Sequence, residues 1–459
     1  MDVIAAIAAG GSAPGAIGIV RVSGEGCFAI CEAVFRAGNG SAFADQEPRK
    51  MIYGRMLDDQ GRLIDRGLAV RFPGPHSYTG EDCAEFHCHG SPVVLRELLA
   101  ALFAAGARQA GPGEFTQRAF LNGRMDLTEA EAVIDLIDAE TAAAARNAAA
   151  QLSGGLRRVL EPIQDALLEI TSRFYAVVDY PDEDIPDVDA LQIRAALGDA
   201  AGQLDRLLAT CRRGRVLKNG VRTAIVGLPN AGKSSLLNAL AGYDRAIVTD
   251  VPGTTRDTVE ESVFCGGVLL RLIDTAGIRE SANVVEQLGV ERSRRALDSA
   301  ELVLAVIDGS VPVTAEAREV LALVRKSEKP FIVIFSKLDL GTAPHTCLDG
   351  AGGRPVAAVH LSARTGEGIS VLEDTVAALF PAGDGGDAGA LLTDARQEEA
   401  AGRARAAVGR AAEALDAGLT PDAVLTDAEE ALDALGELTG RTARDEIVSR
   451  IFSRFCVGK

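Results

Sequence analysis

Residues 221–240 read V-R-T-A-I-V-G-L-P-N-A-G-K-S-S-L-L-N-A-L, an apolar run followed by a glycine-rich turn and a helix-like segment. The turn, Gly227 to Ser234, has the spacing G-x-x-x-x-G-K-S of a phosphate-binding loop. In that motif backbone N–H groups surround the phosphates, the lysine reaches the β and γ phosphates, and the serine holds Mg²⁺. The alternative is a glycine-rich turn without a ligand. The strand-like residues before the turn and the helix-like residues after it favour the phosphate site.

Four further motifs follow this loop in the order that a GTPase requires. Residues 253–257 offer a threonine hydroxyl for Mg²⁺, and residues 274–277 (D-T-A-G) follow a strand-like run, where the aspartate can hold the Mg²⁺ shell. Residues 336–339 (S-K-L-D) and 362–364 (S-A-R) each end a strand-like run and are typical of guanine-binding loops. The carboxylate of Asp339 can accept two N–H groups from guanine, which adenine does not offer. The ordered set predicts a GTPase.

The residues that we expect at the GTP site come from these five motifs and from positions directly next to them. They are Asn230, Ala231, Gly232, Lys233, Ser234, Ser235, Thr249, Asp250, Val251, Pro252, Gly253, Thr254, Thr255, Asp274, Thr275, Ala276, Gly277, Ser336, Lys337, Asp339, Ser362, Ala363 and Arg364. Within this set, Ser234 and Thr255 are the expected Mg²⁺ ligands. Ser336 stands where the usual N-K-x-D motif has asparagine, so the longer amide is missing. Because Asp339 is retained, we expect guanine preference with weaker base binding.

Composition limits the other possibilities. The formal net charge of −18 argues against a general nucleic-acid binder, although a local basic face is possible and Arg441, Arg444, Arg450, Arg454 and Lys459 are candidates. No apolar run reaches the roughly 20 residues that span a bilayer, and the N-terminus lacks the basic region of a secretory signal. The eight cysteines are scattered without a C-x-x-C pair. We therefore expect a cytoplasmic protein with reduced thiols.

The chain of 459 residues predicts a multidomain protein of α/β and α class. An α+β domain is expected over residues 1–118, with strands at 17–22 and 67–72 and a helix from Pro92 to Ala105. Alternating strands and helices predict a nucleotide domain over 220–380. Alanine-rich helical segments occupy 119–219 and 381–459. We interpret these two segments as one discontinuous helical domain with the nucleotide domain inserted.

Several local features give sharper expectations. Thr128 and Glu131 match a helix capping box, and Pro162 favours the start of a helix close to it. Residues 212–218 are interpreted as a basic linker. A metal site at His87, Cys88 and His89 is disfavoured because a second ligand pair is missing.

Along its whole length the chain resembles the MnmE (TrmE) family of bacterial tRNA modification GTPases. The resemblance rests on the phosphate loop and on four other stretches: G-E-D at 80–82, P-G-E-F at 112–115, R-A-F-L-N at 118–122 and F-C-V-G-K at 455–459. It implies an N-terminal domain that binds tetrahydrofolate and forms a homodimer, a discontinuous helical domain and an inserted Ras-like G domain.

The same resemblance implies a partner and a reaction. The partner is MnmG, which brings FAD and NADH. Together such proteins add an aminomethyl or carboxymethylaminomethyl group to C5 of the wobble uridine of certain tRNAs. The one-carbon unit comes from a tetrahydrofolate derivative, 5-formyl- or 5,10-methylene-tetrahydrofolate.

The residues around the phosphates also suggest how GTP is hydrolysed. Ile278 and Arg279 follow Gly277, so the water-orienting glutamine of Ras-type enzymes is missing. The Asn230 side chain can offer an oxygen to a monovalent cation, which would stabilise transition-state charge. By resemblance this cation is K⁺, with ligands Asn230, Thr249, Val251 and Thr254. The resemblance also makes Glu286 the catalytic residue that orients the water and Arg279 its support, whereas on sequence alone Glu286 could be a solvated charge.

For folate, the resemblance places four residues at the site: Arg21, Glu85, Arg124 and Lys459. Basic side chains suit the carboxylates of the glutamate tail, and Glu85 suits the donor edge of the pterin. Taken alone, each could be an ordinary surface charge, and Arg124 replaces a family lysine. Cys456 could be a nucleophile or a small buried hydrophobe, and we assign it no catalytic role.

Two other functions are compatible with parts of the chain. A regulatory or ribosome-assembly GTPase would carry the same nucleotide motifs without a part in modification chemistry. A stand-alone folate enzyme would leave the G domain unexplained. The N-terminal motifs and residues 455–459 argue against the first alternative.

Overall fold

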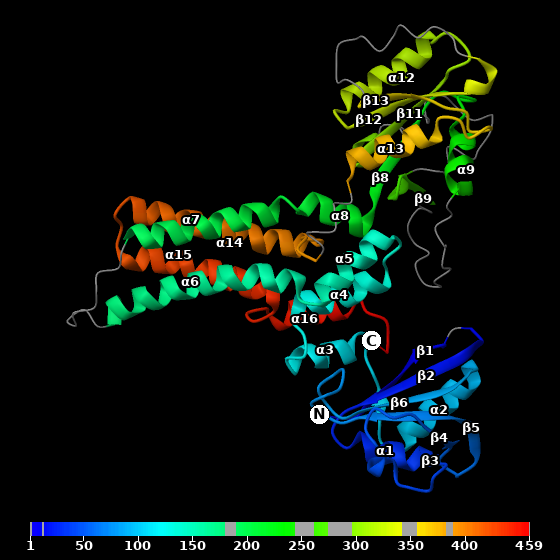
Figure 1. Cartoon of the computed structure of the whole chain (residues 1–459), viewed down its shortest axis with the longest axis vertical. Helices are drawn as coiled ribbons and strands as arrows, with labels where there is room; N and C mark the ends of the chain where they lie inside the picture. Colours follow the sequence, from blue (N-terminus) through cyan, green and yellow to red (C-terminus); the bar gives the residue numbers. More distant parts are fainter. Residues whose placement is uncertain are drawn as a thin grey trace. The chain divides into compact units, whose positions relative to one another are not determined.

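A computed structural model describes residues 2–11, 13–179, 190–243, 261–273, 296–341, 356–381 and 389–458. The expected combination of an N-terminal α+β domain, helical segments and an α/β nucleotide domain is confirmed (Figure 1). The chain forms two compact units. The first contains Met1–Ile134, Ala149–Leu204 and Glu399–Lys459, and the second contains Asp135–Ala148 and Asp205–Glu398. Within the described ranges, no helix is both long enough and apolar enough to cross a membrane.

The N-terminal part of the first unit is built on a seven-stranded sheet of order β3-β4-β5-β6-β2-β1-β7. Its strands are β1 (Ile4–Ala9), β2 (Gly15–Ser23), β3 (Phe35–Ala37), β4 (Ile52–Leu57), β5 (Leu63–Phe72), β6 (Cys83–Gly90) and β7 (Arg108–Gln109). The predictions of strands at 17–22 and 67–72 are confirmed by β2 and β5.

One face of this sheet packs on α1 (Cys27–Val34) and α2 (Pro92–Ala104). Val20 and Phe86 are fully buried on that face. Because side chains alternate along a strand, their neighbours Arg21 and Glu85 point to the opposite face. There α3 (Glu114–Leu121) adds Phe115, which packs with Ile4. The sheet thus has one apolar core face and one face with charged groups.

The helical segments are α4 (Leu127–Ile137), α5 (Ala142–Leu152), α6 (Gly155–Asp179), α7 (Ala190–Leu208), α8 (Cys211–Asn219), α14 (Ala395–Asp416), α15 (Pro421–Thr439) and α16 (Asp445–Phe452). In the first unit α6 lies along α15, although their residues are far apart in the sequence (Figure 1). Along α6 an apolar seam faces the helical core, since Leu160, Ile163 and Leu167 are fully buried.

Three local expectations are wrong. The capping box lies two residues earlier: the Glu129 amide donates to Asp126 Oδ1 at 2.9 Å, and the Asp126 amide donates to Glu129 Oε2 at 2.8 Å. Pro162 lies inside α6, where burial of the seam on both sides of it outweighs the lost backbone hydrogen bond. The expected linker at 212–218 is helix α8, which packs Gly214 directly against the backbone of Leu392.

The second unit contains a six-stranded sheet of order β13-β12-β11-β8-β10-β9. Its strands are β8 (Val221–Val226), β9 (Glu261–Cys265), β10 (Val268–Ile273), β11 (Leu302–Asp308), β12 (Phe331–Ser336) and β13 (Ala357–His360), accompanied by α9 (Lys233–Tyr243), α12 (Ala315–Lys326) and α13 (Ile369–Leu379). All strand pairs are parallel except the β9–β10 hairpin. The predicted alternation of strands and helices is confirmed.

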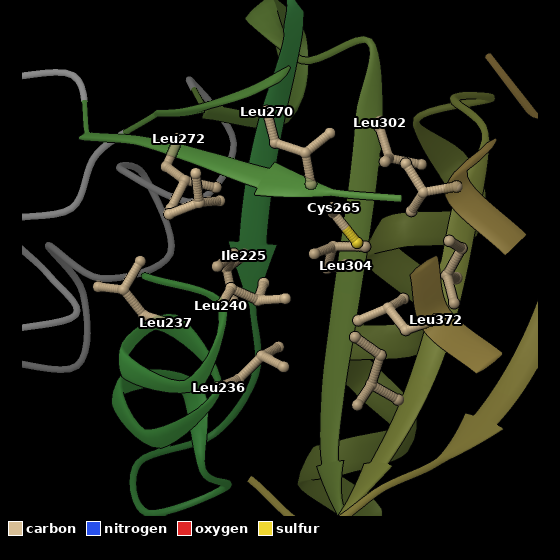
Figure 2. Close-up of a cluster of buried hydrophobic side chains, with 14 of the residues drawn as sticks. Ile225, Leu236, Leu237, Leu240, Cys265, Leu270, Leu272, Leu302, Leu304 and Leu372 are labelled. Atoms are coloured by element: carbon tan, nitrogen blue, oxygen red, sulfur yellow. The ribbon is translucent and has the colours of Figure 1, made fainter. Parts of the chain in front are cut away.

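The core of this domain fixes the helix that follows the phosphate loop. Leu236 and Leu240 of α9 pack with Ile225 of β8 and with side chains of β10 and β11 (Figure 2). Because β8, β12 and β13 are parallel, their carboxyl ends meet at one edge of the sheet. In α/β sheets that edge is where ligands bind. The fold therefore brings the phosphate loop and both predicted guanine loops to the same edge.

Candidate functional site

The phosphate loop leaves the end of β8 in a conformation that requires glycine. A Cβ on Gly227 would lie 2.3 Å from the carbonyl oxygen of Val306, so a larger residue would collide with β11. Further along, Asn230 has φ 61° and Gly232 has φ 100°, both in the left-handed region. Asn230 is exposed, which leaves its side-chain amide accessible at the loop surface. The backbone thus forms the turn from strand to helix that phosphate binding needs.

Lys233 begins α9, and its ammonium group lies within the loop. Its Nζ donates hydrogen bonds to the carbonyl oxygens of Gly227 at 2.7 Å and Leu228 at 2.8 Å. Burial of the side chain lowers the pKa of Lys233. Ser234 and Ser235 follow in the first turn of α9 and are exposed. A cation and a helix N-terminus are therefore placed together, an arrangement that favours anions.

The guanine motif lies at the end of β12 and in the short 3-10 helix η2 (Leu338–Leu340). Asp339 Oδ1 accepts a 2.7 Å hydrogen bond from the Ser362 hydroxyl, which joins the two predicted guanine loops. Arg364 lies 3.8 Å from the other carboxylate oxygen of Asp339 and is exposed, whereas Ala363 is half-buried. Lys337 Nζ pairs with Asp308 Oδ2 at 2.6 Å. Ser336 is buried beneath the phosphate loop.

The remaining predicted residues of the nucleotide site lie outside the described ranges. They are Thr249, Asp250, Val251, Pro252, Gly253, Thr254, Thr255, Asp274, Thr275, Ala276, Gly277, Arg279 and Glu286. Lys459 of the predicted folate site also lies outside them. The described part of the nucleotide site therefore consists of the phosphate loop and the base loops.

A second cluster lies on the open face of the N-terminal sheet. Arg21 Nε donates to Glu85 Oε1 at 2.9 Å, and both side chains are largely buried. The Arg21 guanidinium lies 5.3 Å from the ring centre of Tyr78 and 5.7 Å from that of Phe115. Two predicted folate residues are thus in direct contact, and two aromatic rings pack against Arg21. Such a site can hold a flat ring by stacking and offers a carboxylate to its N–H groups.

Histidine 87 extends this cluster, and sequence reasoning did not assign it there. His87 Nε2 is buried, lies 3.4 Å from Glu85 Oε2 and forms no hydrogen bond within the described residues. His89 instead contacts Asp65 at 3.0 Å. Cys88 points to the other face, and burial raises the pKa of its thiol to about 11. Cys88 therefore lies on the opposite face from the two histidines, which have different partners. His87 could have been found from its two-residue spacing to Glu85.

A buried arginine holds the loop that covers this face. Arg118 is 4% exposed and pairs with Asp2 at 2.9 Å, Glu114 at 2.9 Å and Glu81 at 3.1 Å. Sequence reasoning included Arg118 in a family motif but gave it no role. Arg124, the third predicted folate residue, is exposed, and its stem would be 3.3 Å from a Cβ on Gly80 in the same loop. Arg124 is therefore near the loop, but no described contact joins it to Arg21 or Glu85.

The last described residues return to the N-terminal domain. The Gly113 amide donates to the carbonyl oxygen of Cys456 at 3.3 Å, and Val457 forms a β-bridge with Pro112. A Cβ on Gly458 would lie 2.3 Å from the carbonyl oxygen of Ile7. Cys456 is exposed, so its interpretation as a buried hydrophobe is wrong. Its neighbour Phe455 takes the buried position because it packs on Phe452.

Two family models match consecutive parts of this chain. A family model described as GTP-binding protein TrmE N-terminus matches residues 3–124, and one described as MnmE helical domain matches residues 127–456. The tRNA modification GTPase MnmE of Akkermansia muciniphila is 43% identical over 97% of this chain and 96% of its own length. Proteins of the same name from Heliobacterium modesticaldum and a Roseiflexus species are 42% and 44% identical, each over 100% of this chain and 99% of the relative.

Proposed function

Because the chain belongs to the MnmE family of tRNA modification GTPases, we propose that it is a potassium-dependent GTPase acting with MnmG. The pair adds an aminomethyl or carboxymethylaminomethyl group to C5 of the wobble uridine of certain tRNAs. The single observation that carries GTP binding is the junction of the phosphate loop with Asp339 and Ser362 at one sheet edge.

The geometry of the described loop fits a nucleotide with a divalent ion. Lys233 lies where phosphate oxygens can replace the carbonyl groups that it now contacts. Ser234 and Thr255 would hold Mg²⁺, which balances the charge of the β and γ phosphates. Asp339 would accept the two N–H groups on the edge of guanine.

A monovalent cation is part of this proposal. Asn230, Thr249, Val251 and Thr254 would bind K⁺, which would supply positive charge beside the phosphates. The exposed amide of Asn230, held in the left-handed region, supports this assignment. Glu286 would orient the attacking water, and Arg279 would support that segment. GTP turnover should therefore be several-fold faster in KCl than in NaCl at equal ionic strength.

The role of Glu286 has a direct test. In Glu286→Ala, GTP binding should persist while K⁺-stimulated hydrolysis falls by about 100-fold, as expected for loss of a water-positioning group. Glu319→Ala, on the exposed surface of α12, is the matched control. Unchanged turnover in Glu286→Ala would remove this residue from the mechanism.

The cluster on the N-terminal sheet is the proposed folate site. Glu85, held by its ion pair with Arg21, would accept hydrogen bonds from the donor edge of the pterin, and Tyr78 would lie against its ring. Arg124 and Lys459 would add positive charge for the glutamate tail. Such a site would present a tetrahydrofolate one-carbon unit, while FAD and NADH would be bound by MnmG.

We also propose that the N-terminal domain forms the homodimer. Ile17 and Tyr53 project from the same sheet face as Arg21 and are 63% and 57% exposed. Large apolar groups on an open sheet face support association of two copies. We further propose the four-part division 1–118, 119–219, 220–380 and 381–459, and a cytoplasmic location in which the cysteines stay reduced.

The decisive experiment is mass spectrometry of wobble uridine in tRNA from a deletion strain. Loss of the C5 group, restored by the wild-type gene, is the expected result. Intact modification would favour the alternative of a regulatory or ribosome-assembly GTPase. Complementation with Glu85→Gln would then separate folate chemistry from GTP turnover, because the G domain is unchanged in that variant.

A further inference from the structure

We propose that Ser336 is a positioning residue of the nucleotide site, which holds the phosphate loop through its hydroxyl and does not contact the base. This inference rests on the proposed GTPase function and deepens it. Its starting point is the departure from the usual N-K-x-D sequence, where this chain has S-K-L-D.

Within the described residues, the Ser336 hydroxyl contacts the phosphate loop and β11 and not the base loops. Ser336 is the last residue of β12 and is 3% exposed. Its Oγ lies 2.5 Å from the carbonyl oxygen of Ala231 in the phosphate loop and 3.1 Å from that of Ile307 in β11. Both partners are acceptors and a hydroxyl has one hydrogen, so Ser336 donates to one of them at a time. The shorter contact ties β12 directly to the loop.

The fit between Ser336 and the loop is close. A Cβ on Gly232 would lie 3.1 Å from Ser336 Oγ and 3.2 Å from its Cβ. Gly232 immediately precedes Lys233 and has φ 100°. Ser336 therefore packs against the phosphate-loop backbone at Gly232, where the chain enters α9. Any shift of this support moves the amides and the ammonium group that would face the phosphates.

The other residues of the motif have separate contacts. Lys337 pairs with Asp308 at the end of β11, and the Gly309 amide donates to the Ser336 carbonyl oxygen at 2.9 Å. Asp339 is held by Ser362. Base recognition thus lies with Asp339, whereas Ser336 acts on the phosphate side. The missing asparagine should then affect how tightly any phosphorylated nucleotide binds, and not how well guanine is distinguished from other bases.

Nucleotide affinities of the full chain test this assignment. In Ser336→Ala, affinities for GDP and IDP should fall by the same factor, about 5- to 10-fold, which corresponds to one hydrogen bond. IDP lacks the exocyclic amino group that would donate a hydrogen bond to Asp339, so the ratio of GDP to IDP affinity reports base recognition. Ser336→Cys, with a weaker donor, should give a smaller loss. Ser327→Ala, at the C-terminal end of α12, is the control and should bind both nucleotides like the wild type.

Each outcome has a defined meaning. A parallel loss for GDP and IDP with an unchanged ratio supports the proposal. Unchanged affinities in Ser336→Ala would overturn it, and so would a loss confined to GDP, which would place the hydroxyl at the base. If the wild type binds ATP as tightly as GTP, the guanine-nucleotide function fails first, independently of any Ser336 variant. Thermal unfolding midpoints of both variants check that the G domain is folded.

Discussion

The Ser362 hydroxyl donates a 2.7 Å hydrogen bond to Asp339 Oδ1 and so fixes a carboxylate at the edge of the nucleotide site. In Asp339→Asn an amide replaces the carboxylate, so an N–H donor replaces one of the two acceptor oxygens. GDP affinity should fall by about 10- to 100-fold, the usual worth of a hydrogen bond to a charged group. XDP, which has a carbonyl in place of the amino group, should gain affinity. Competition binding measures both changes, and equal losses for GDP and XDP would contradict base recognition by Asp339.

The lowered pKa of Lys233 predicts proton uptake on nucleotide binding. Burial lowers this pKa, and phosphate oxygens would raise it again by favouring the charged form. As pH rises toward the usual lysine pKa of 10.5, the protein should therefore bind a proton together with GDP, and GDP affinity should fall. Calorimetry in buffers of different ionisation enthalpy measures this uptake. Lys326→Met, at an exposed position of α12, is the control and should keep the proton uptake. If the binding enthalpy of the wild type does not depend on the buffer, the prediction is contradicted.

Glu114 predicts how the N-terminal domain responds to acid. Burial alone would raise its pKa, but hydrogen bonds from Arg108, the Gly111 amide and Arg118 outweigh burial and lower the pKa to about 2. The stabilisation is therefore complete above the usual value of 4.5 and is lost as pH falls toward about 2. In Glu114→Gln the free energy of local unfolding should drop by about 3 kcal/mol at neutral pH, with the difference from wild type shrinking in acid.

Hydrogen exchange of the β1 and β2 amides in the full chain measures this free energy. Glu97→Gln, an exposed position on α2, is the control and should leave the exchange rates unchanged. A difference between Glu114→Gln and wild type that persists undiminished near pH 3 would show that the carboxylate charge is not responsible.

Alanine substitutions at two glycines that follow helices distinguish the cost of backbone strain from the cost of a steric collision. Gly440 has φ 90°, and a Cβ there would lie 2.6 Å from a ring carbon of Phe120. Gly418 also has a positive φ, 65°, but a Cβ there would meet nothing within 4 Å. We expect Gly418→Ala to cost about 1 kcal/mol from backbone strain, and Gly440→Ala to cost a further 1–3 kcal/mol from overpacking. Equal shifts in the thermal unfolding midpoint would show that Phe120 moves aside freely.

The sequence predicted the nucleotide domain well because its information is local. A strand, a glycine turn with fixed spacing and a helix N-terminus are adjacent in 221–240, and each predicted strand of this domain within the described residues is present. The same holds for Asp339, whose position follows from the end of β12.

Arg118 shows why other features could not be predicted. Its burial depends on carboxylates from three separate places in the chain, Asp2, Glu81 and Glu114. A buried arginine is stable only with such partners, and no spacing in the sequence reveals that they meet. The position of the capping box was predicted wrongly for a different reason. Asp126 and Thr128 both begin a capping-box pattern, and only the hydrogen bonds show that Asp126 is the cap.

The packing of α6 on α15 has a consequence for biosynthesis. The partner of the apolar seam at Leu160 to Phe174 begins only at Pro421, after the whole nucleotide domain has been translated. At roughly 5–20 residues per second, this interval of synthesis lasts many seconds, during which the seam has no α15 to cover it. The nucleotide domain, whose strands pair among themselves, can fold in that time. Ribosome-bound chains halted before Pro421 should therefore expose α6 to chaperones, and release of the last helices should end that exposure.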